Sequence, residues 1–324
     1  MHSGREGRTV FVAMKELRAT PLLDKAAHVA LARSGRLVLF HDLADPVFVD
    51  ALGSRAETRR HLSARRSEAM MRLESLGAPW RARGLEISCS AEWDFPPHAA
   101  IVRAATHVRA DLIVVQARGR HRLPALLGYT DWSLLRDSPI PVLLVKRRRP
   151  YRRPRILAAV DPAHAHSKPL ALDDAILGEA SRLAESFGGS AHVVHSYLSS
   201  RPTVMRGVAP GARARADKVA RDAARAALAG CLEGWEVPET RQHLVPGEPA
   251  EAILRTQRSV GAAVVAMGAV SRRGLKGMFI GNTAERLLDE LPCDLLVVKP
   301  ADFAARVARA RRGANLVSVG AFAG

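Results

Sequence analysis

Short apolar runs alternate with longer segments of helical periodicity along most of the chain. The runs have the length of buried strands, and the segments between them have the length of helices. The two longest helical segments are Glu57–Ala78 and Ala212–Glu233. The alternation predicts five strands in each half: Thr9–Lys15, Gly35–His41, Leu85–Ala91, Asp111–Gln116 and Pro141–Lys146, then Arg155–Asp161, Gly189–His195, Glu239–Val245, Ala263–Gly268 and Asp294–Lys299.

The second half of the chain repeats the first in the order of its elements and in several positions. Pro97 and Ile101, in "DFPPHAAIV", align without a gap with Pro249 and Ile253, in "PGEPAEAIL". The segments that close the two halves, "GYTDWSLLRDSPIPVLLVK" and "GNTAERLLDELPCDLLVVK", align position for position. Repetition on this scale predicts a duplicated domain.

Strands that alternate with helices are typical of βαβ units, in which right-handed crossovers join parallel strands. We therefore predict an α/β protein of two tandem Rossmann-like domains, each a mainly parallel five-stranded sheet with helices on both faces. A length of 324 residues suits two domains. The predicted domains are residues 1–149 and 150–300, followed by a basic C-terminal tail, residues 301–324.

The composition is that of a globular protein, with 48% hydrophobic and 25% charged residues. The sequence contains no apolar run long enough to span a membrane and no signal-peptide pattern at its start. Cys89, Cys231 and Cys293 are odd in number and far apart, which disfavours a disulfide framework or a zinc site. We expect a cytoplasmic protein with no metal and no membrane partner, in which Cys293 is a buried apolar residue.

A formal net charge of +17 leaves two interpretations open. Such a surface attracts nucleic acid, but arginine-rich helices with solvated outer faces produce the same excess. Aromatic residues make up only 5% of the chain and are not interleaved with basic ones, so no base-stacking platform is indicated. The densest basic stretch, Lys146–Arg155, contains Pro150 and Pro154 at the middle of the chain. These features favour a stiff, exposed linker.

The closing segment of the second half, "VVAMGAVSRRGLKGMFIGNTAERLLDELPCDLLVVKP", resembles that of the universal stress proteins of the UspA superfamily. With "TDWSLLRDSPIPVLLVK" in the first half, the resemblance extends to the tandem, two-domain E-type members and covers Thr9 to Pro300. It implies two UspA-type (HUP-like) domains that pair within the chain through their fifth strands. It also implies a cytoplasmic stress-response protein with a role in resistance to DNA damage.

ATP-binding members of that family carry G-x2-G-x9-G-[ST] in this segment, because glycines and a helix N-terminus admit phosphate groups. In this chain Gly268 and Gly281 match the first and third glycines, and Gly274 is present as in many members. Ser271 replaces the second glycine, and Asn282 replaces the serine or threonine. The resemblance adds Thr283 in the helix and Asp161 after the first strand of the domain as candidate ligands of ATP or a related nucleotide.

Asn282 also has a purely structural interpretation. It can cap a helix that begins at Thr283, with Glu285 completing a capping box. The first half departs further from the family pattern at the positions of Asp161, Gly268, Ser271 and Gly281–Asn282, where it has Lys15, Gln116, Gly119 and Gly128–Tyr129. We predict that its site is degenerate.

Other polar residues are predicted to be structural. His192 and His195 lie three apart on one strand and therefore face opposite sides of the sheet. The acidic pairs Asp173–Asp174 and Asp289–Glu290 fit solvated helix faces. The sequence shows no recognisable constellation of nucleophile and base, so we expect no catalytic residue.

The sequence therefore favours a non-enzymatic stress protein whose nucleotide site is degenerate in the first half. Two alternatives remain open: an ATP-binding or slowly ATP-hydrolysing regulator that uses the second domain, and a basic protein associated with nucleic acid. Beyond the pairing of its own domains, the expected partners are a second copy of the chain and unidentified proteins.

Overall fold

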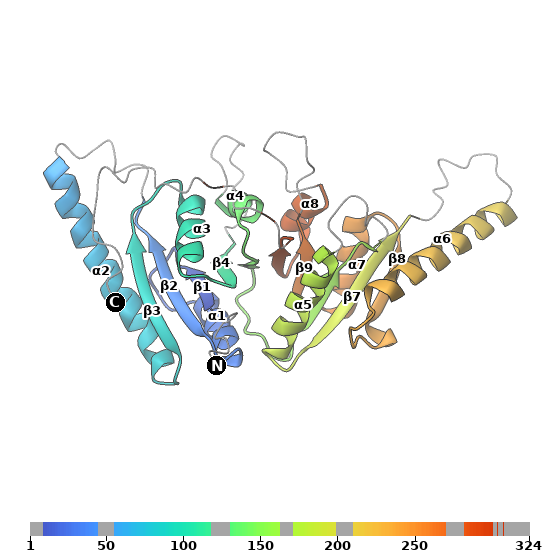
Figure 1. The fold of residues 1–324 in the computed structure, drawn as a ribbon, viewed down its shortest axis with the longest axis horizontal. Helices are drawn as coiled ribbons and strands as arrows, with labels where there is room; N and C mark the ends of the chain where they lie inside the picture. Colours follow the sequence, from blue (N-terminus) through green and yellow to red (C-terminus); the bar gives the residue numbers. More distant parts are fainter. Residues whose placement is uncertain are drawn as a thin grey trace, which may run out of the picture. The chain divides into compact units, whose positions relative to one another are not determined.

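The computed structural model describes residues 9–44, 55–117, 130–162, 171–198, 210–269 and 282–300, together with Phe303 and Val307. These residues form two compact units, which divide between Pro150 and Tyr151. Each unit contains a parallel sheet flanked by helices (Figure 1). Apart from Phe303 and Val307, the predicted basic tail lies outside the described residues.

The first unit has five parallel strands in the order β3-β2-β1-β4-β5. Apolar runs such as "LIVV" in β4 are fully buried, as expected for a strand covered on both faces. Figure 1 shows α2 lying along β3. The elements are β1 (Thr9–Ala13), α1 (Pro21–Ala32), β2 (Arg36–Asp42), α2 (Arg55–Arg81), β3 (Glu86–Glu92), α3 (Pro97–His107), β4 (Leu112–Gln116), α4 (Thr130–Asp137) and β5 (Val142–Val145).

The second unit repeats this order as β8-β7-β6-β9-β10, again with parallel pairs. The predicted duplication is therefore confirmed strand by strand. Its elements are β6 (Arg155–Ala159), α5 (Ala171–Glu185), β7 (Ser190–Tyr197), α6 (Pro210–Cys231), the 3-10 helix η2 (Glu239–Arg241), β8 (Gln242–Pro246), α7 (Pro249–Val260), β9 (Val264–Gly268), α8 (Asn282–Glu290) and β10 (Asp294–Val298).

The third strand of the second unit differs from the sequence prediction at its start. The predicted strand began at Glu239, but residues 239–241 form η2 and β8 begins at Gln242. Pro238 precedes this turn, and its carbonyl accepts a hydrogen bond of 2.8 Å from the Arg241 N–H. Because the Arg241 N–H is used in this turn, it is not available for pairing with a neighbouring strand. The pairing of β8 with β7 therefore starts at Gln242.

Helix α7 shows how local sequence sets the bounds of an element. Glu248 caps its N-terminus by accepting hydrogen bonds from the N–H groups of Ala250 and Glu251, and Pro249 occupies the first turn. Gly261 ends the helix with a φ of 67°, a left-handed conformation that favours glycine. The predicted "PGEPAEAIL" repeat is therefore a helix start.

Equivalent positions in the first helices of the two units hold opposite charges. Lys25 in α1 is buried, and its Nζ donates a hydrogen bond of 2.8 Å to the carbonyl of Arg147. Glu179 stands at the same place in α5, measured from the glycine before the next strand, and pairs with Arg182 at 2.7 Å. The two units therefore share the same order of strands and helices, but they differ in the polar residues at equivalent positions of their first helices.

No helix in the described part of the chain is long and apolar enough to cross a membrane. Cys293, next to β10, is completely buried, as the sequence predicts.

Candidate nucleotide site

The candidate site lies at the carboxyl ends of the first and fourth strands of each unit, where the strand order reverses. In open α/β sheets, ligands bind at such a switch point. In the second unit the register pairs Ala159 of β6 with Met267 of β9, which places Asp161 and Gly268 at the same edge of adjacent strands. The structure thus brings together two of the predicted ligand residues.

The other predicted ligand residues lie on the segment after β9. Ser271, Gly274 and Gly281 are outside the described residues, as is the side chain of Asn282. Helix α8 begins at Asn282, one residue before the predicted start, and Thr283 is in its first turn and partly exposed. The proposed cap by Asn282 therefore remains a prediction.

Packing alone accounts for the glycine at position 268. A Cβ atom there would lie 2.7 Å from Leu172 Cδ2 and 3.2 Å from Ile176 Cδ1, both on α5. The first is shorter than a normal carbon–carbon contact, so a larger residue would force the buried Leu172 side chain to move. Packing against α5 therefore favours glycine at this position whether or not a phosphate binds.

Asp173 is a site residue that the sequence interpretation missed. It was expected on a solvated helix face, but it is only 7% exposed, and its Oδ1 accepts a hydrogen bond of 3.1 Å from the Asp161 N–H. That prediction was wrong for Asp173, although Asp174 is exposed. Asp173 shares the buried face of α5 with Ile176, Leu177 and Ala180, so helical periodicity was the available signal.

A histidine restrains the end of the first strand in both units. His41 Nδ1 lies 2.7 Å from the carbonyl oxygen of Met14, and His195 Nδ1 lies 3.3 Å from that of Val160. Burial lowers the pKa of His41, against the opposing effect of the hydrogen bond to Met14. The structural role expected for His195 is confirmed, whereas His41 was not singled out from the sequence.

The first-unit counterpart of the site has a different polar character. Lys15 follows β1 and Gln116 ends β4, and both side chains are exposed. The register places these residues at one sheet edge, as in the second unit. Gly119, Gly128 and Tyr129 lie outside the described residues. A cation and an amide thus stand where the second unit has Asp161 and Gly268.

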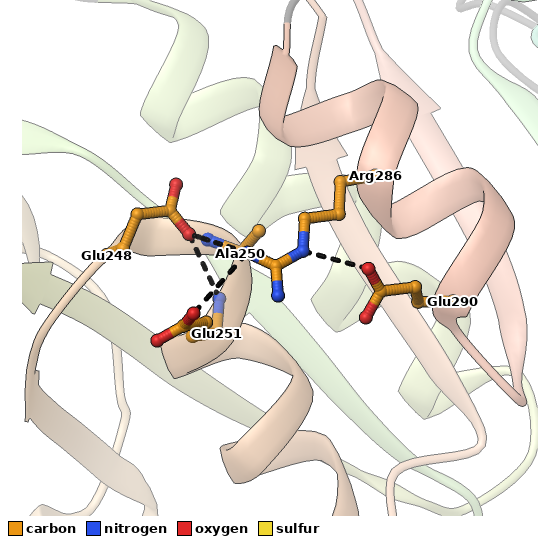
Figure 2. Close-up of polar contacts among 5 residues, drawn as sticks. All are labelled: Glu248, Ala250, Glu251, Arg286 and Glu290. Atoms are coloured by element: carbon orange, nitrogen blue, oxygen red, sulfur yellow. Dashed lines mark hydrogen bonds and ion pairs between the residues drawn. The ribbon is translucent and has the colours of Figure 1, made fainter.

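Arg286, in the middle of α8, is surrounded by carboxylates (Figure 2). Its Nε lies 2.8 Å from Glu290, and its Nη1 lies 3.4 Å from Glu248 and 3.6 Å from Glu251. These contacts tie α8 to the capped start of α7. The charge of Arg286 is therefore balanced by carboxylates, whereas the basic residues of the candidate phosphate segment itself, Arg272, Arg273 and Lys276, lie outside the described residues.

The equivalent helix pair of the first unit is joined by different chemistry. His98 of α3 lies 3.6 Å from the carboxylate of Asp137 in α4, and Arg136 binds the same carboxylate at 2.7 Å. Burial lowers the pKa of His98, although the charge of Asp137 raises it. The contact between α3 and α4 in the first unit thus corresponds to that between α7 and α8 in the second, but the charged side chains that make it differ.

Replacing Glu248 with alanine removes both the cap of α7 and one carboxylate beside Arg286. We expect the free energy of unfolding of the second unit to fall by about 1 kcal/mol, since the loss of an N-cap acceptor typically costs this much. Hydrogen exchange of α7 peptides measures the change. Glu251→Ala is the control, because this carboxylate lies 3.6 Å from Arg286 and caps no N–H group. Equal losses in both variants would contradict the capping role.

His192 and His243 form a stacked pair on β7 and β8, with ring centroids 5.5 Å apart and Nδ1 and Nε2 separated by 3.2 Å. His192 is partly exposed, whereas His195 is buried, which confirms that the two face opposite sides of the sheet. Burial, followed by the charges of His243, Arg241 and Arg155, lowers the pKa of His192 to about 4. Among the described residues, no group of three or more His, Cys, Asp or Glu side chains is arranged to hold a metal ion.

The lowered pKa of His192 predicts a loss of stability in acid. Above pH 6.5 the His192 imidazole is neutral in both the folded and the unfolded states. Between pH 6.5 and about pH 4 it is protonated in the unfolded chain but stays neutral in the folded protein, so acid favours unfolding. In the His192→Gln variant, the urea midpoint should therefore fall less steeply between pH 6.5 and 4 than in the unmodified protein. If the urea midpoint fell equally steeply with pH in both proteins, the pKa of His192 would not be lowered in the folded state.

Comparison with known proteins gives two matches to one family model. The model described as "Universal stress protein family" matches residues 7–146 and again residues 152–299. Universal stress protein E of Escherichia coli (strain K12) is 31% identical over 223 residues, which cover 67% of this chain and 69% of that protein. The protein of the same name from Photorhabdus laumondii is 25% identical over 287 residues, covering 87% of this chain and 91% of that protein.

Two solved structures from Pseudomonas aeruginosa resemble the whole tandem chain. A protein of unknown function from strain PAO1 has a TM-score of 0.71 at 25% identity and covers 92% of this chain and 94% of its own. A putative universal stress protein from strain UCBPP-PA14 has a TM-score of 0.70 at 26% identity, with coverage of 92% and 95%.

Proposed function

The chain belongs to the universal stress protein family and contains two consecutive domains of that family, and from this premise we propose that it is a cytoplasmic stress-response protein that catalyses no reaction. The observation that carries the proposal is the double family match, together with 31% identity to universal stress protein E over two thirds of the chain. The role in resistance to DNA damage is part of this proposal.

Three features support a function that does not depend on nucleotide. Packing against Leu172 accounts for Gly268 without a ligand. The charge of Arg286 is already balanced by carboxylates. At the equivalent edge of the first unit, Lys15 stands in place of the aspartate. Each of these features is explained, among the described residues, without a bound nucleotide.

The alternative is a regulator that binds, or slowly hydrolyses, ATP in its second unit. The observation that favours it is the position of Asp161 beside Gly268 at the switch point, the place where α/β sheets bind ligands. If nucleotide binds there, Thr283 at the start of α8 and the segment containing Ser271, Gly274, Gly281 and Asn282 would face its phosphates.

Nucleotide released from freshly purified protein by heat separates the two functions. The proposal predicts no stoichiometric ATP, ADP or AMP by chromatography, and hydrolysis of added ATP no faster than in buffer. Near-stoichiometric nucleotide that disappears in Asp161→Ala but persists in Lys15→Ala would establish the alternative. The lysine variant is the matched control because it occupies the equivalent position of the first unit.

Survival of a deletion strain tests the stress role. We expect the strain to recover less well than its parent after ultraviolet irradiation, and the gene encoding the unmodified protein to restore survival. An Asp161→Ala gene should restore it equally, because the proposed role needs no nucleotide. Equal survival of parent and deletion strains would contradict the DNA-damage role. The pairing of the two domains and the formation of a homodimer stay predictions.

A further inference from the structure

The most basic surface segment of the protein lies where the sequence favoured only a linker. We call residues 147–153 the arginine segment; it contains Arg147, Arg148, Arg149, Arg152 and Arg153. The chain has no aspartate or glutamate between residues 138 and 160. The side chains of all five arginines are exposed. Five exposed guanidinium groups therefore share one stretch of chain with no acidic neighbour in sequence.

The backbone of the arginine segment is held at both ends. On the first unit, the buried Nζ of Lys25 donates a hydrogen bond of 2.8 Å to the carbonyl of Arg147. On the second unit, the hydroxyl of Tyr151 is hydrogen-bonded to the buried carboxylate of Asp294, and its ring packs edge-on against Phe187 with centroids 4.9 Å apart. These contacts distinguish the arginine segment from a linker that makes no contact with the units it joins.

The end of the segment is also packed against the sheet. Pro154 is buried, and its carbonyl accepts a hydrogen bond of 3.0 Å from the Ser190 N–H at the start of β7. Arg153 has a φ of 43°, in the left-handed region, so the chain turns sharply before it enters β6. Each end of the segment is thus anchored in its own unit, which lowers the cost of ordering the arginines near that end when they bind a partner.

The chemistry of the segment selects a phosphodiester backbone. Guanidinium groups bind phosphate oxygens through paired N–H donors. Tyr151 is the segment's aromatic residue, and its packing against Phe187 makes it unsuited to stacking on bases. The segment also has no exposed large apolar side chain of the kind that anchors a protein in a lipid surface. We propose that the arginine segment binds the phosphate backbone of duplex nucleic acid without reading its sequence.

Binding through phosphates has a measurable salt dependence. If Arg148, Arg149, Arg152 and Arg153 each contact one phosphate, the slope of log K against log salt concentration is about −3.6, from about −0.9 per contact on duplex DNA. The affinity should then fall about 150-fold between roughly 50 and 200 mM salt. The proposal stands independently of whether the protein binds nucleotide in its second unit.

The test compares two full-length variants with the same change in net charge. In one, Arg148, Arg149, Arg152 and Arg153 are replaced by glutamine. In the other, glutamine replaces four basic residues exposed on α2 and α6: Arg59, Arg60, Arg215 and Lys218. Fluorescence anisotropy of a labelled random-sequence DNA duplex gives affinity and salt slope. We expect the first variant to lose at least 100-fold in affinity at low salt and about 3.6 units of slope, and the second to lose less than about 5-fold in affinity.

Three other results would overturn the proposal. Equal losses in both variants would assign binding to the overall charge. Binding of the unmodified protein to phosphatidylserine vesicles but not to the duplex would assign the segment to membranes. A measurement on the unmodified protein makes the test independent of folding: the duplex should protect the four arginines, and not Arg59 or Arg215, from modification by phenylglyoxal. Absence of that protection would equally refute the site.

Discussion

Replacing Gly189 with alanine is expected to destabilise the second unit by about 3 kcal/mol, because no space exists for a methyl group. A Cβ atom at this position would lie 2.1 Å from the carbonyl oxygen of Pro154 and 2.9 Å from its Cδ. Both atoms belong to a rigid residue, so the backbone has to move. Movement would also weaken the hydrogen bond from Ser190 to the same carbonyl.

Hydrogen exchange of the β6 and β7 peptides in the full-length protein measures this loss within the second unit. Gly211→Ala is the matched control, since a Cβ atom there meets no atom within 4 Å and alanine favours the helix. A loss below about 1 kcal/mol in Gly189→Ala would show that the strand adjusts at little cost. It would also weaken the argument that the end of the arginine segment is firmly packed.

Replacing Tyr151 with phenylalanine is expected to lower the free energy of unfolding of the second unit by about 2 to 3 kcal/mol. Asp294 is completely buried, and the variant removes the hydroxyl that donates to its carboxylate. A buried carboxylate that loses a hydrogen bond regains the part of its desolvation cost that this bond had offset. Burial, and then the charge of Asp294, also raises the pKa of Tyr151 well above its usual value, so the hydroxyl remains a donor at neutral pH.

A double-mutant cycle distinguishes this bond from simple loss of packing. In an Asp294→Asn background no carboxylate remains to be left uncompensated, so Tyr151→Phe should cost less than half as much. Hydrogen exchange of the β10 peptide provides the measurement. Identical costs in the two backgrounds would show that the ring of Tyr151, rather than its hydroxyl, stabilises this region.

The sequence predicted the central strands of each sheet well because they are short apolar runs bounded by polar or glycine residues. β9 and β10 are nearly continuous runs of buried residues, and such strands need little tertiary information to identify. The start of β8 was misplaced because the turn after Pro238 depends on one backbone hydrogen bond that no residue pattern specifies.

The site was less accessible to sequence reasoning than the fold. Asp161 and Gly268 lie far apart in the chain, and only the pairing of β6 with β9 places them side by side. Asp173 was wrongly predicted to be solvated because it was treated together with its neighbour Asp174. The structure shows that Asp173 is buried and Asp174 is exposed, and residue type alone does not distinguish them. The role of Gly268 in helix packing could not be read from a loop pattern, since it depends on where Leu172 lies on α5.

The opposite charges of Lys25 and Glu179 have a consequence for the history of the chain. If the first helices were exchanged between the halves, a carboxylate would face the Arg147 carbonyl, two acceptors with no proton between them. Recombination between the duplicated gene segments would thus yield poorly folded products. The two copies are therefore not interchangeable at this helix, although their strands follow the same order.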